Sequence, residues 1–495
     1  MPSVVPAPAW TVAILFSRVL VPCALLGLAS CEEPLQSFVH DAGQGADAQS
    51  MLVGPPSDAA VAAAPDATTV AVERSALTAL SPAQLPAALP DRSNAYADDP
   101  AAARLGQKMF FDPGFSGALL DGDNDGSKNA LGMRGEPGRV SCAGCHVPEA
   151  GFSDNRTLGG AISLGAGWGR RRTPSLLDVG QSTVVMWDGR HDTLYNQVFG
   201  PFESGFEMNS SRLYVAQHVY GTYRAEYEAV FGPLPPLADS ARFPSLSPTQ
   251  TGCRHLDNAP FPPVCDGDKR GMPGDGAEYD EMAAADQHAV TQVVVNVGKA
   301  ISAYERLLRC GQGRFDAWVQ GDDSALSAAE QRGAALFVGK AHCVDCHSGP
   351  FFSDQGFHNV GMRAATVSVV FTATNDPGAS VGVGQAMADP LNVRGEFSDG
   401  DDGRLPSRVP DAYTGAFRTP TLRCVDMRPR FMHTGQLRSL EEVVAFFNRG
   451  GDTGGYVGAS ELHPLGLSAD EEGDLVAFLR ALRGPGPGAE LLARP

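Results

Sequence analysis

The sequence lacks an excess of basic residues, and beyond residue 30 it lacks long apolar runs. Its 38 lysines and arginines are outnumbered by 57 aspartates and glutamates, so the formal net charge is −19 at pH 7. An acidic surface repels phosphate, which argues against a nucleic-acid partner, and it could steer a basic protein partner instead. Because no apolar run after residue 30 is long enough to span a bilayer, we expect membrane contact only through the N-terminal segment.

Extended sheet is also expected to be scarce. Glycine and proline, 57 and 37 of the 495 residues, make up nearly a fifth of the chain and favour long ordered loops. Apolar residues recur at helical spacing in residues 102–111 and 288–308. The predicted fold class is therefore mainly α, and the chain is long enough for two or three domains.

The N-terminal segment predicts export. Its apolar run leads into Leu28-Ala29-Ser30-Cys31, which resembles a bacterial lipoprotein signal, so we expect residues 1–31 to be a signal peptide and Cys31 to be lipidated. The first basic residue is Arg18, which leaves ordinary cleavage, an uncleaved anchor or a misassigned start codon open. The chain is exported in each case, and we predict a periplasmic protein anchored to a membrane as a lipoprotein. Residues 32–97, rich in Ala, Pro and Asp, predict a flexible tether.

Two pentads of one form carry the most specific chemistry. They are Cys142-Ala143-Gly144-Cys145-His146 and Cys343-Val344-Asp345-Cys346-His347. In such a pentad both thiols form thioethers with the vinyl groups of haem c, and the adjoining histidine binds the iron. A pair of structural CxxC sites or a zinc site split between the pentads are the alternatives. We predict two covalently bound haem c groups, which are attached outside the cytoplasm, where disulfides also form.

Two haem sites predict two haem domains. We place the N-terminal domain at residues 98–285, with a Pro- and Gly-rich loop insertion at 233–282, and the C-terminal domain at 286–495, with the helix at 288–308 packed between them. Cys253 and Cys265 close a short loop and are expected to form a disulfide. Cys310 and Cys424 either pair or remain buried thiols.

The sequence around the pentads resembles a known family. The segments FFDP, PEAGFSD, TPSLLD, WDGR, NQVFGP and GFEM, and later GPFFSDQGFHNVG and FMHTGQ, are similar to those of bacterial di-haem cytochrome c peroxidases and of the related maturases of methylamine dehydrogenase. The resemblance covers about residues 98 to 485. It implies two cytochrome c-like domains with long irregular loops, the first binding peroxide and the second transferring electrons.

The resemblance also implies three catalytic residues. Glu207 matches the carboxylate that moves a proton between the two oxygens of hydrogen peroxide. Gln197 matches an amide that holds peroxide or water by hydrogen bonds. Trp187 matches the tryptophan between the two haems, where its indole either relays an electron or only packs.

The sequence departs from the peroxidase pattern at both irons. Many peroxidases have a histidine where this chain has Ala166, and that histidine is the resting sixth ligand of the peroxidatic haem. Because alanine has no donor atom, we expect the iron held by His146 to be five-coordinate or water-bound at rest, unless His191 or His218 substitutes. At the second iron the aligned residue is Phe447, where peroxidases have methionine and maturases tyrosine. Its possible sixth ligands are Met432, Met362 and Met427, or none.

A third departure concerns calcium. The calcium ligands of the family align with Arg172 and Arg428, and a guanidinium cannot coordinate a cation. We therefore doubt that calcium is present, and we expect the arginines to neutralise haem propionates or acids instead.

These observations favour a di-haem cytochrome c peroxidase, an oxidoreductase that reduces hydrogen peroxide to water. Its electrons would come from a small donor protein, either a cytochrome c or a cupredoxin. A maturase-like enzyme that oxidises Trp or Tyr side chains of a partner protein is the first alternative. A non-enzymatic dihaem electron-transfer cytochrome is the second, and Glu207 with its surrounding motif argues against it.

Overall fold

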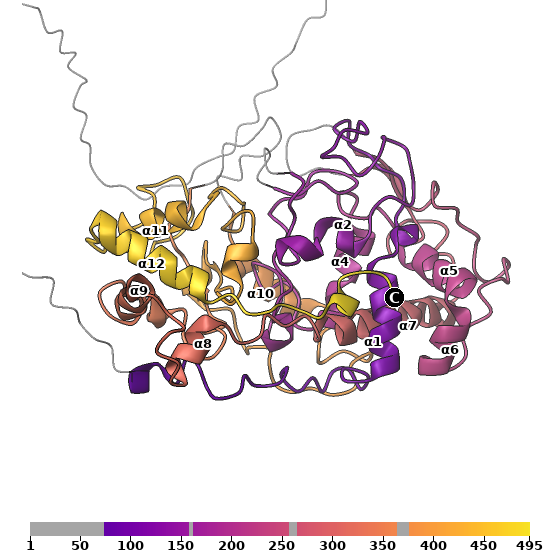
Figure 1. Ribbon diagram of the computed structural model, residues 1–495. Coiled ribbons are helices and arrows are strands. Elements are labelled where there is room, and N and C mark those ends of the chain that lie inside the picture. Colours follow the sequence, from indigo (N-terminus) through magenta and orange to yellow (C-terminus); the bar gives the residue numbers. More distant parts are fainter. Residues whose placement is uncertain (1–73, 158–161, 257–264, 364–375) are drawn as a thin grey trace, which may run out of the picture. The chain divides into compact units, whose positions relative to one another are not determined.

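A computed structural model of the chain describes residues 74–157, 162–256, 265–363 and 376–495 (Figure 1). These residues belong to one compact unit and are mainly helical, with little sheet, which confirms the predicted class. The expected signal peptide, Cys31 and the first part of the expected tether lie outside the described residues. The helices of eight or more residues are α1 (Pro100–Phe110), α5 (Arg212–Thr222), α6 (Arg224–Phe231), α7 (Ala284–Glu305), α9 (Ala328–Val338), α10 (Ala379–Ala388), α11 (Leu440–Asn448) and α12 (Ala469–Ala481).

Shorter elements form the loops that connect these helices. The short α-helices are α2 (Cys142–Cys145), α3 (Leu194–Gln197), α4 (Phe199–Glu203) and α8 (Arg314–Val319). Strand β1 (Gly252–Leu256) pairs antiparallel with β2 (Cys265–Arg270), inside the segment expected as an insertion. Strand β3 (Phe357–His358) pairs antiparallel with β4 (Phe417–Arg418).

The first hydrophobic core forms around α7, which packs against α1, α3 and α5 (Figure 1). Two glycines allow the close approach of these helices. A β-carbon at Gly106 of α1 would lie 1.9 Å from the carbonyl oxygen of Ala300, and one at Gly298 of α7 would lie 2.2 Å from that of Tyr195. Larger residues at either position would force the helices apart.

The second core lies beside the second pentad. Helix α12 packs against α9 and α11, and Gly333 allows α9 to approach the backbone of Asp474. Four phenylalanines pack edge to face or tilted in its centre: Phe315, Phe337, Phe352 and Phe478.

Helix α7 belongs to the first core. Its apolar residues pack against helices that precede it in sequence, and the same core includes Leu391, Phe397 and Cys424 from beyond the expected boundary at residue 286. The expected packing of α7 between two domains stays a prediction.

Two disulfides are formed. Cys253 is bonded to Cys265 across the β1–β2 hairpin. Cys310 is bonded to Cys424, 114 residues later. We call residues 142–208, which begin with the first pentad, the first haem segment, and residues 343–452, which begin with the second pentad, the second haem segment. The disulfide thus joins the chain after α7 to the second haem segment. A buried ion pair lies nearby, in which the Arg423 guanidinium contacts the Asp316 carboxylate at 2.9 Å.

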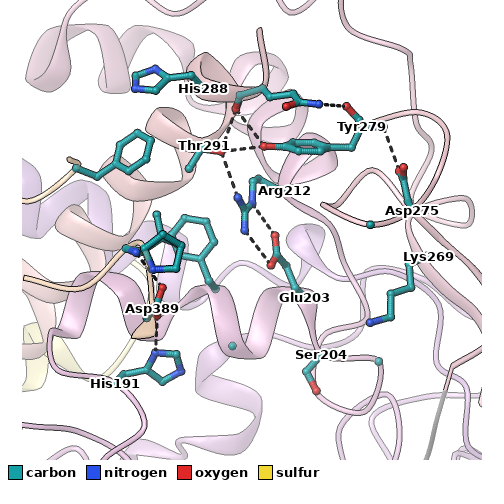
Figure 2. Close-up of a pocket in the computed structure, with 18 of the residues that line it drawn as sticks. His191, Glu203, Ser204, Arg212, Lys269, Asp275, Tyr279, His288, Thr291 and Asp389 are labelled. Carbon is teal, nitrogen blue, oxygen red and sulfur yellow. Dashed lines mark hydrogen bonds and ion pairs between the residues drawn. The ribbon is translucent and has the colours of Figure 1, made fainter. Parts of the chain in front are cut away.

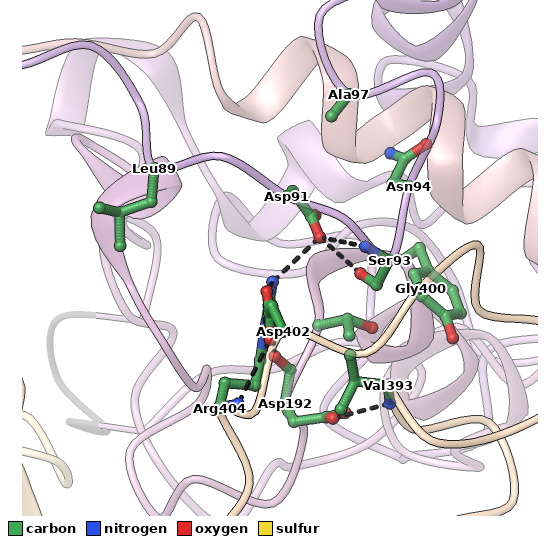
Figure 3. A network of polar contacts seen from close by, with 12 residues as sticks. Leu89, Asp91, Ser93, Asn94, Ala97, Asp192, Val393, Gly400, Asp402 and Arg404 are labelled. Atoms are coloured by element: carbon green, nitrogen blue, oxygen red, sulfur yellow. Dashed lines mark hydrogen bonds and ion pairs between the residues drawn. The ribbon is translucent and has the colours of Figure 1, made fainter.

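The described part of the expected tether contacts the body of the protein. Residues 74–97 run along the body, where the guanidinium of Arg306 donates to the carbonyl oxygen of Leu89 at 2.7 Å. Figure 3 shows Asp91 bonded to Arg404 at 3.0 Å. The expectation of a flexible tether is therefore wrong for this part, because distant arginines satisfy polar groups that the local sequence leaves unpaired.

The two haem segments share local backbone conformations. Phe152 and Phe352, which follow the two pentads, have positive φ angles of 56° and 52°. Met186 and Met432 have φ angles of 69° and 68°, and each lies in a turn closed by an antiparallel bridge. Such angles are uncommon for residues other than glycine. Their recurrence indicates that the segments are two copies of one structural unit.

None of the helices in the described part of the chain is both long enough and apolar enough to cross a membrane.

Candidate functional site

The first pentad forms helix α2. The hydroxyl of Ser141 accepts a hydrogen bond from the backbone N–H of Gly144 and caps this short helix. Its two thiols, Cys142 and Cys145, are free. Burial raises the pKa of the Cys142 thiol above its usual range and that of Cys145 to about 11. Both are therefore neutral thiols before any bond to a cofactor forms.

The histidine of each pentad is held in the same way. His146 Nδ1 lies 3.0 Å from the carbonyl oxygen of Phe152, and His347 Nδ1 lies 2.8 Å from that of Phe352. A carbonyl at Nδ1 requires the proton there and leaves Nε2 as the donor for a metal. Burial also lowers the pKa of each imidazole to about 4, so both rings are neutral ligands at pH 7.

These features fit covalently held haem c. Each pentad presents two free thiols and one neutral imidazole. The hydrogen bond at Nδ1 fixes the orientation of each imidazole ring. A zinc site split between the pentads receives no support, because no cluster of three or more His, Cys, Asp or Glu side chains able to hold a metal exists within the described ranges. The CxxC pairs are not disulfides either.

Glu207 lies beside the first pentad. Its carboxyl group is among the charges that raise the pKa of both Cys142 and Cys145. Burial raises the pKa of Glu207 itself, and the positive charge of Arg190 opposes that rise. No ion pair engages this carboxyl group in the described part of the chain. A carboxyl group with a raised pKa can both accept and return a proton near neutral pH.

Ala166 lies directly against the Glu207 turn. It is fully buried, and its backbone N–H donates to the carbonyl oxygen of Glu207 at 2.7 Å. The backbone N–H of neighbouring Gly167 donates to the carbonyl oxygen of Phe206 at 3.0 Å. These two hydrogen bonds hold the loop at residues 166–167 against the Glu207 turn. The residue next to the catalytic candidate therefore has a methyl side chain that cannot bind iron.

The two histidines that could substitute for Ala166 differ in their contacts. His218 Nε2 bonds the carboxylate of Asp112 at 3.0 Å, and its ring packs edge to face on Phe115. His191 Nδ1 is buried without a hydrogen bond and lies 3.8 Å from the carboxylate of Asp389.

Gln197 and Trp187 are linked through Met186. Gln197 ends α3, and its side-chain amide lies 3.5 Å from the sulfur of Met186. The indole N–H of Trp187 donates to the carbonyl oxygen of Arg172 at 2.7 Å. The backbone N–H of Arg418, in β4, donates to the carbonyl oxygen of Trp187 at 2.8 Å. Trp187 is thus bonded to both haem segments.

The three methionines considered for the second iron occupy different places. Met432 lies in the turn closed by the Phe431–Leu437 bridge, and Met362 is 8% exposed. Met427 packs against the first core, where a β-carbon at Gly151 would lie 3.2 Å from its own.

Arg172 and Arg428, which we expected to neutralise haem propionates or acids, are bonded to oxygen atoms of the chain. The Arg172 guanidinium donates to Thr157 Oγ1 at 3.2 Å and also contacts the carbonyl oxygen of Asp154. Arg428 donates to the carbonyl oxygen of Thr421 at 2.8 Å, while its Nε is buried without a partner. Burial lowers the pKa of both arginines to about 10, and the charge of Arg418 contributes at Arg428.

A pocket of about 1210 Å³ opens next to the Glu207 turn (Figure 2). Ser204, Gly205 and Phe206 line it, as do parts of α4, α5, α7, β2 and residues 389–397. Figure 2 shows Arg212 paired with Glu203 at 2.8 Å. The same guanidinium lies over the rings of Phe199 and Tyr279.

Comparisons with known proteins agree with this geometry. The sequence profile of the family described as di-haem cytochrome c peroxidase matches residues 100–250. The methylamine utilization protein MauG of Methylorubrum extorquens is 30% identical over 386 residues, which cover 78% of each chain. This chain belongs to the di-haem cytochrome c peroxidase family. A cytochrome-c peroxidase of Denitromonas iodatirespirans is also 30% identical, over 399 residues that cover 78% of this chain and 83% of that one.

The family fold is found in solved structures as well. The diheme peroxidase BthA from Burkholderia thailandensis superposes with a TM-score of 0.54 at 21% identity, over 78% of this chain and 87% of that one. As a member of the family, the chain is a peroxidase-type oxidoreductase with two haem groups.

Sequence reasoning missed two features of the site. The carbonyl groups of Phe152 and Phe352 orient the haem histidines, and the repeated Phe-Ser-Asp after each pentad was a signal for them. Arg418 was also missed, because its neighbours come from distant parts of the chain.

Proposed function

We propose that this chain reduces hydrogen peroxide to water at the haem held by Cys142, Cys145 and His146. The reaction takes up two electrons and two protons for each peroxide and releases two molecules of water. Bound haem c supplies iron that exchanges electrons one at a time. The other steps fall to side chains of the protein.

Glu207 is the proposed proton carrier. Its carboxyl group takes a proton from the peroxide oxygen nearer the iron and delivers it to the outer oxygen, which leaves as water. The raised pKa and the lack of an ion-pair partner among described residues suit this role. Gln197 would orient peroxide through its side-chain amide, and Ala166 leaves access to the iron open.

The second haem, on Cys343, Cys346 and His347, is proposed as the electron entry site. Trp187 would connect it with the first, since its indole N–H and its carbonyl oxygen are bonded to different haem segments. Its donor is proposed to be a small redox protein, a cytochrome c or a cupredoxin. Of the three methionines, Met362 and Met432 suit the sixth position better than Met427, which packs in the first core.

The observation that carries this proposal is the buried Glu207 carboxyl group, whose charge acts on the thiols of the first pentad and whose backbone is bonded to Ala166. The test is steady-state peroxide turnover by the two-haem protein with reduced cytochrome c. Glu207→Gln should lose at least about a hundredfold, the usual contribution of a positioned proton carrier. Glu226→Gln, an exposed acid on α6, is the matched control and should keep wild-type turnover. Full turnover in Glu207→Gln would exclude the proposed role.

A second candidate function is the oxidation of Trp or Tyr side chains on a partner protein. The pocket beside the Glu207 turn favours it, because about 1210 Å³ with aromatic walls is ample for an aromatic side chain. Peroxide-dependent consumption of a tyrosine- or tryptophan-containing peptide, without reduced cytochrome c, would support this function. A non-enzymatic dihaem cytochrome would instead ignore peroxide in both assays.

We also propose that the protein is exported and held at a membrane through a lipid on Cys31. Support comes from the sequence and from haem c, which is attached outside the cytoplasm. Fractionation of cells should find the wild type with membranes and Cys31→Ser in the soluble periplasm. Wild-type protein in the soluble fraction would contradict the anchor.

A further inference from the structure

Two guanidinium groups at the junction of the haem segments have no acidic partner. Arg418 reaches Ser182 Oγ at 3.1 Å, and its Nε lies 3.3 Å from the carbonyl oxygen of Met186. Arg428 bonds only the carbonyl oxygen of Thr421, and its buried Nε has no partner. Within the described ranges, neither arginine forms an ion pair.

Two other arginines with little exposed surface do have carboxylate partners. Arg423 is paired with Asp316 at 2.9 Å, and Arg171 is paired with Asp188 and Asp376. The two acids that influence Arg428 electrostatically are each paired with another arginine, Asp178 through one carboxylate oxygen only.

Asp178 is bonded to Arg309 at 3.0 Å, and Asp426 is bonded to Arg483 at 2.9 Å. A shielded cation without a counter-ion is costly, and two neighbouring cations also repel each other. An anion from outside the polypeptide would offset this cost at Arg418 and Arg428.

Arg418, at the end of β4, and Arg428 lie on either side of residues 419–421, which are bonded to the chain that positions the second haem histidine. The hydroxyl of Ser353 donates to the carbonyl oxygen of Thr419, and that of Thr421 donates to Phe351. The next carbonyl oxygen, that of Phe352, accepts from His347 Nδ1. The arginine pair is thus built into the segment that carries the second haem.

We propose that Arg418 and Arg428 form a carboxylate-binding site for the propionate groups of the haem on Cys343 and Cys346. A guanidinium fork matches a carboxylate with two parallel hydrogen bonds, and haem c carries two carboxylates. This inference rests on the proposed haem attachment but not on peroxide turnover.

The site has a consequence for electron transfer. Reduction adds one negative charge to the haem, and nearby positive charge stabilises the reduced form. The arginine pair should therefore raise the reduction potential of the second haem, which helps it to accept electrons from the donor.

The test is a redox titration of the holoprotein, followed by visible absorbance, after each variant is shown to carry two haems. Arg428→Gln should lower the midpoint potential of one haem and leave the other unchanged. Arg428→Lys keeps the charge and should restore most of that shift. Arg449→Gln removes an exposed arginine of the same segment, 51% exposed and paired with Asp452, and should change neither potential.

Two further results distinguish the source of the anion. At constant ionic strength, wild-type potentials should not respond to chloride or acetate, because a propionate is covalently part of the haem. A response would assign the site to a free anion and overturn the proposal, as would unchanged potentials in Arg428→Gln. If the potential shifts but wild-type protein fails to turn over peroxide, the carboxylate site stands and the proposed function fails.

Discussion

The indole N–H of Trp187 donates a hydrogen bond of 2.7 Å to the carbonyl oxygen of Arg172. Arg172 in turn donates its backbone N–H to the carbonyl oxygen of His433 at 2.8 Å. In the opposite direction, the backbone N–H of Arg418 in the second haem segment donates to the carbonyl oxygen of Trp187, also at 2.8 Å. The segments are therefore joined by reciprocal backbone bonds, with one tryptophan at the centre.

Replacement of Trp187 by Phe should weaken the fold and slow electron passage between the haems. The Arg172 carbonyl loses its indole donor, which we expect to lower the free energy of unfolding by about 1–3 kcal/mol. Urea denaturation measures this loss. Stopped-flow reduction of the second haem followed by peroxide measures the transfer. If Trp187 only packs, the stability falls while the transfer rate is kept.

The resting spin state should follow the residue at position 166. Because Ala166 has no donor atom, we expect the fully oxidised wild type to show one high-spin haem by electron paramagnetic resonance. Ala166→His should convert it to low spin, and Ala166→Val, bulkier but without a donor, should not. A wild type with only low-spin haems would mean that another residue binds the first iron.

Asp192 should make the fold less stable as pH rises. Its carboxyl group accepts from the backbone N–H of Val393 at 2.8 Å (Figure 3), and burial raises its pKa to about 6. Since the unfolded pKa is about 3.9, protonation favours the folded state. The stabilisation is complete below about pH 4 and is lost as pH rises through about 6, a change of up to about 3 kcal/mol.

Denaturation of the wild type and Asp192→Asn at about pH 4 and about pH 7 checks this sign. The variant cannot ionise at this position, so its stability relative to the wild type should improve at the higher pH. If the stabilities of the wild type and Asp192→Asn change equally with pH, Asp192 ionises normally in the folded protein.

The two disulfides should contribute unequally to stability. Cys310–Cys424 closes a loop of 114 residues, whereas Cys253–Cys265 closes one of 12. Chain entropy predicts a loss of about 4–5 kcal/mol for the first pair replaced by alanine and about 3 kcal/mol for the second. Urea denaturation of the two double variants measures both. An equal loss would indicate that loop length does not control their contribution.

Some elements could be predicted because their signals are local. The helices near residues 102–111 and 288–308 follow from apolar spacing, and the haem pentads follow from the side chains that haem attachment needs. The packing of residues 74–97 against the body could not be predicted, because the composition of this segment resembles that of a linker. Its partners, such as Arg306, Arg309 and Arg404, lie more than 200 residues away.

The sequence by itself determined where each haem c is expected to attach, which family the chain resembles, and that Ala166 and Phe447 lack iron-binding atoms. These are properties of single residues and short spacings, which folding does not change. Only the tertiary structure decided the Cys310–Cys424 pairing, the contact of Ala166 with Glu207, and the burial of Arg428 Nε without a hydrogen-bond partner among the described residues. Each depends on the distance between residues remote in sequence, and that distance is set by how the helices and loops pack.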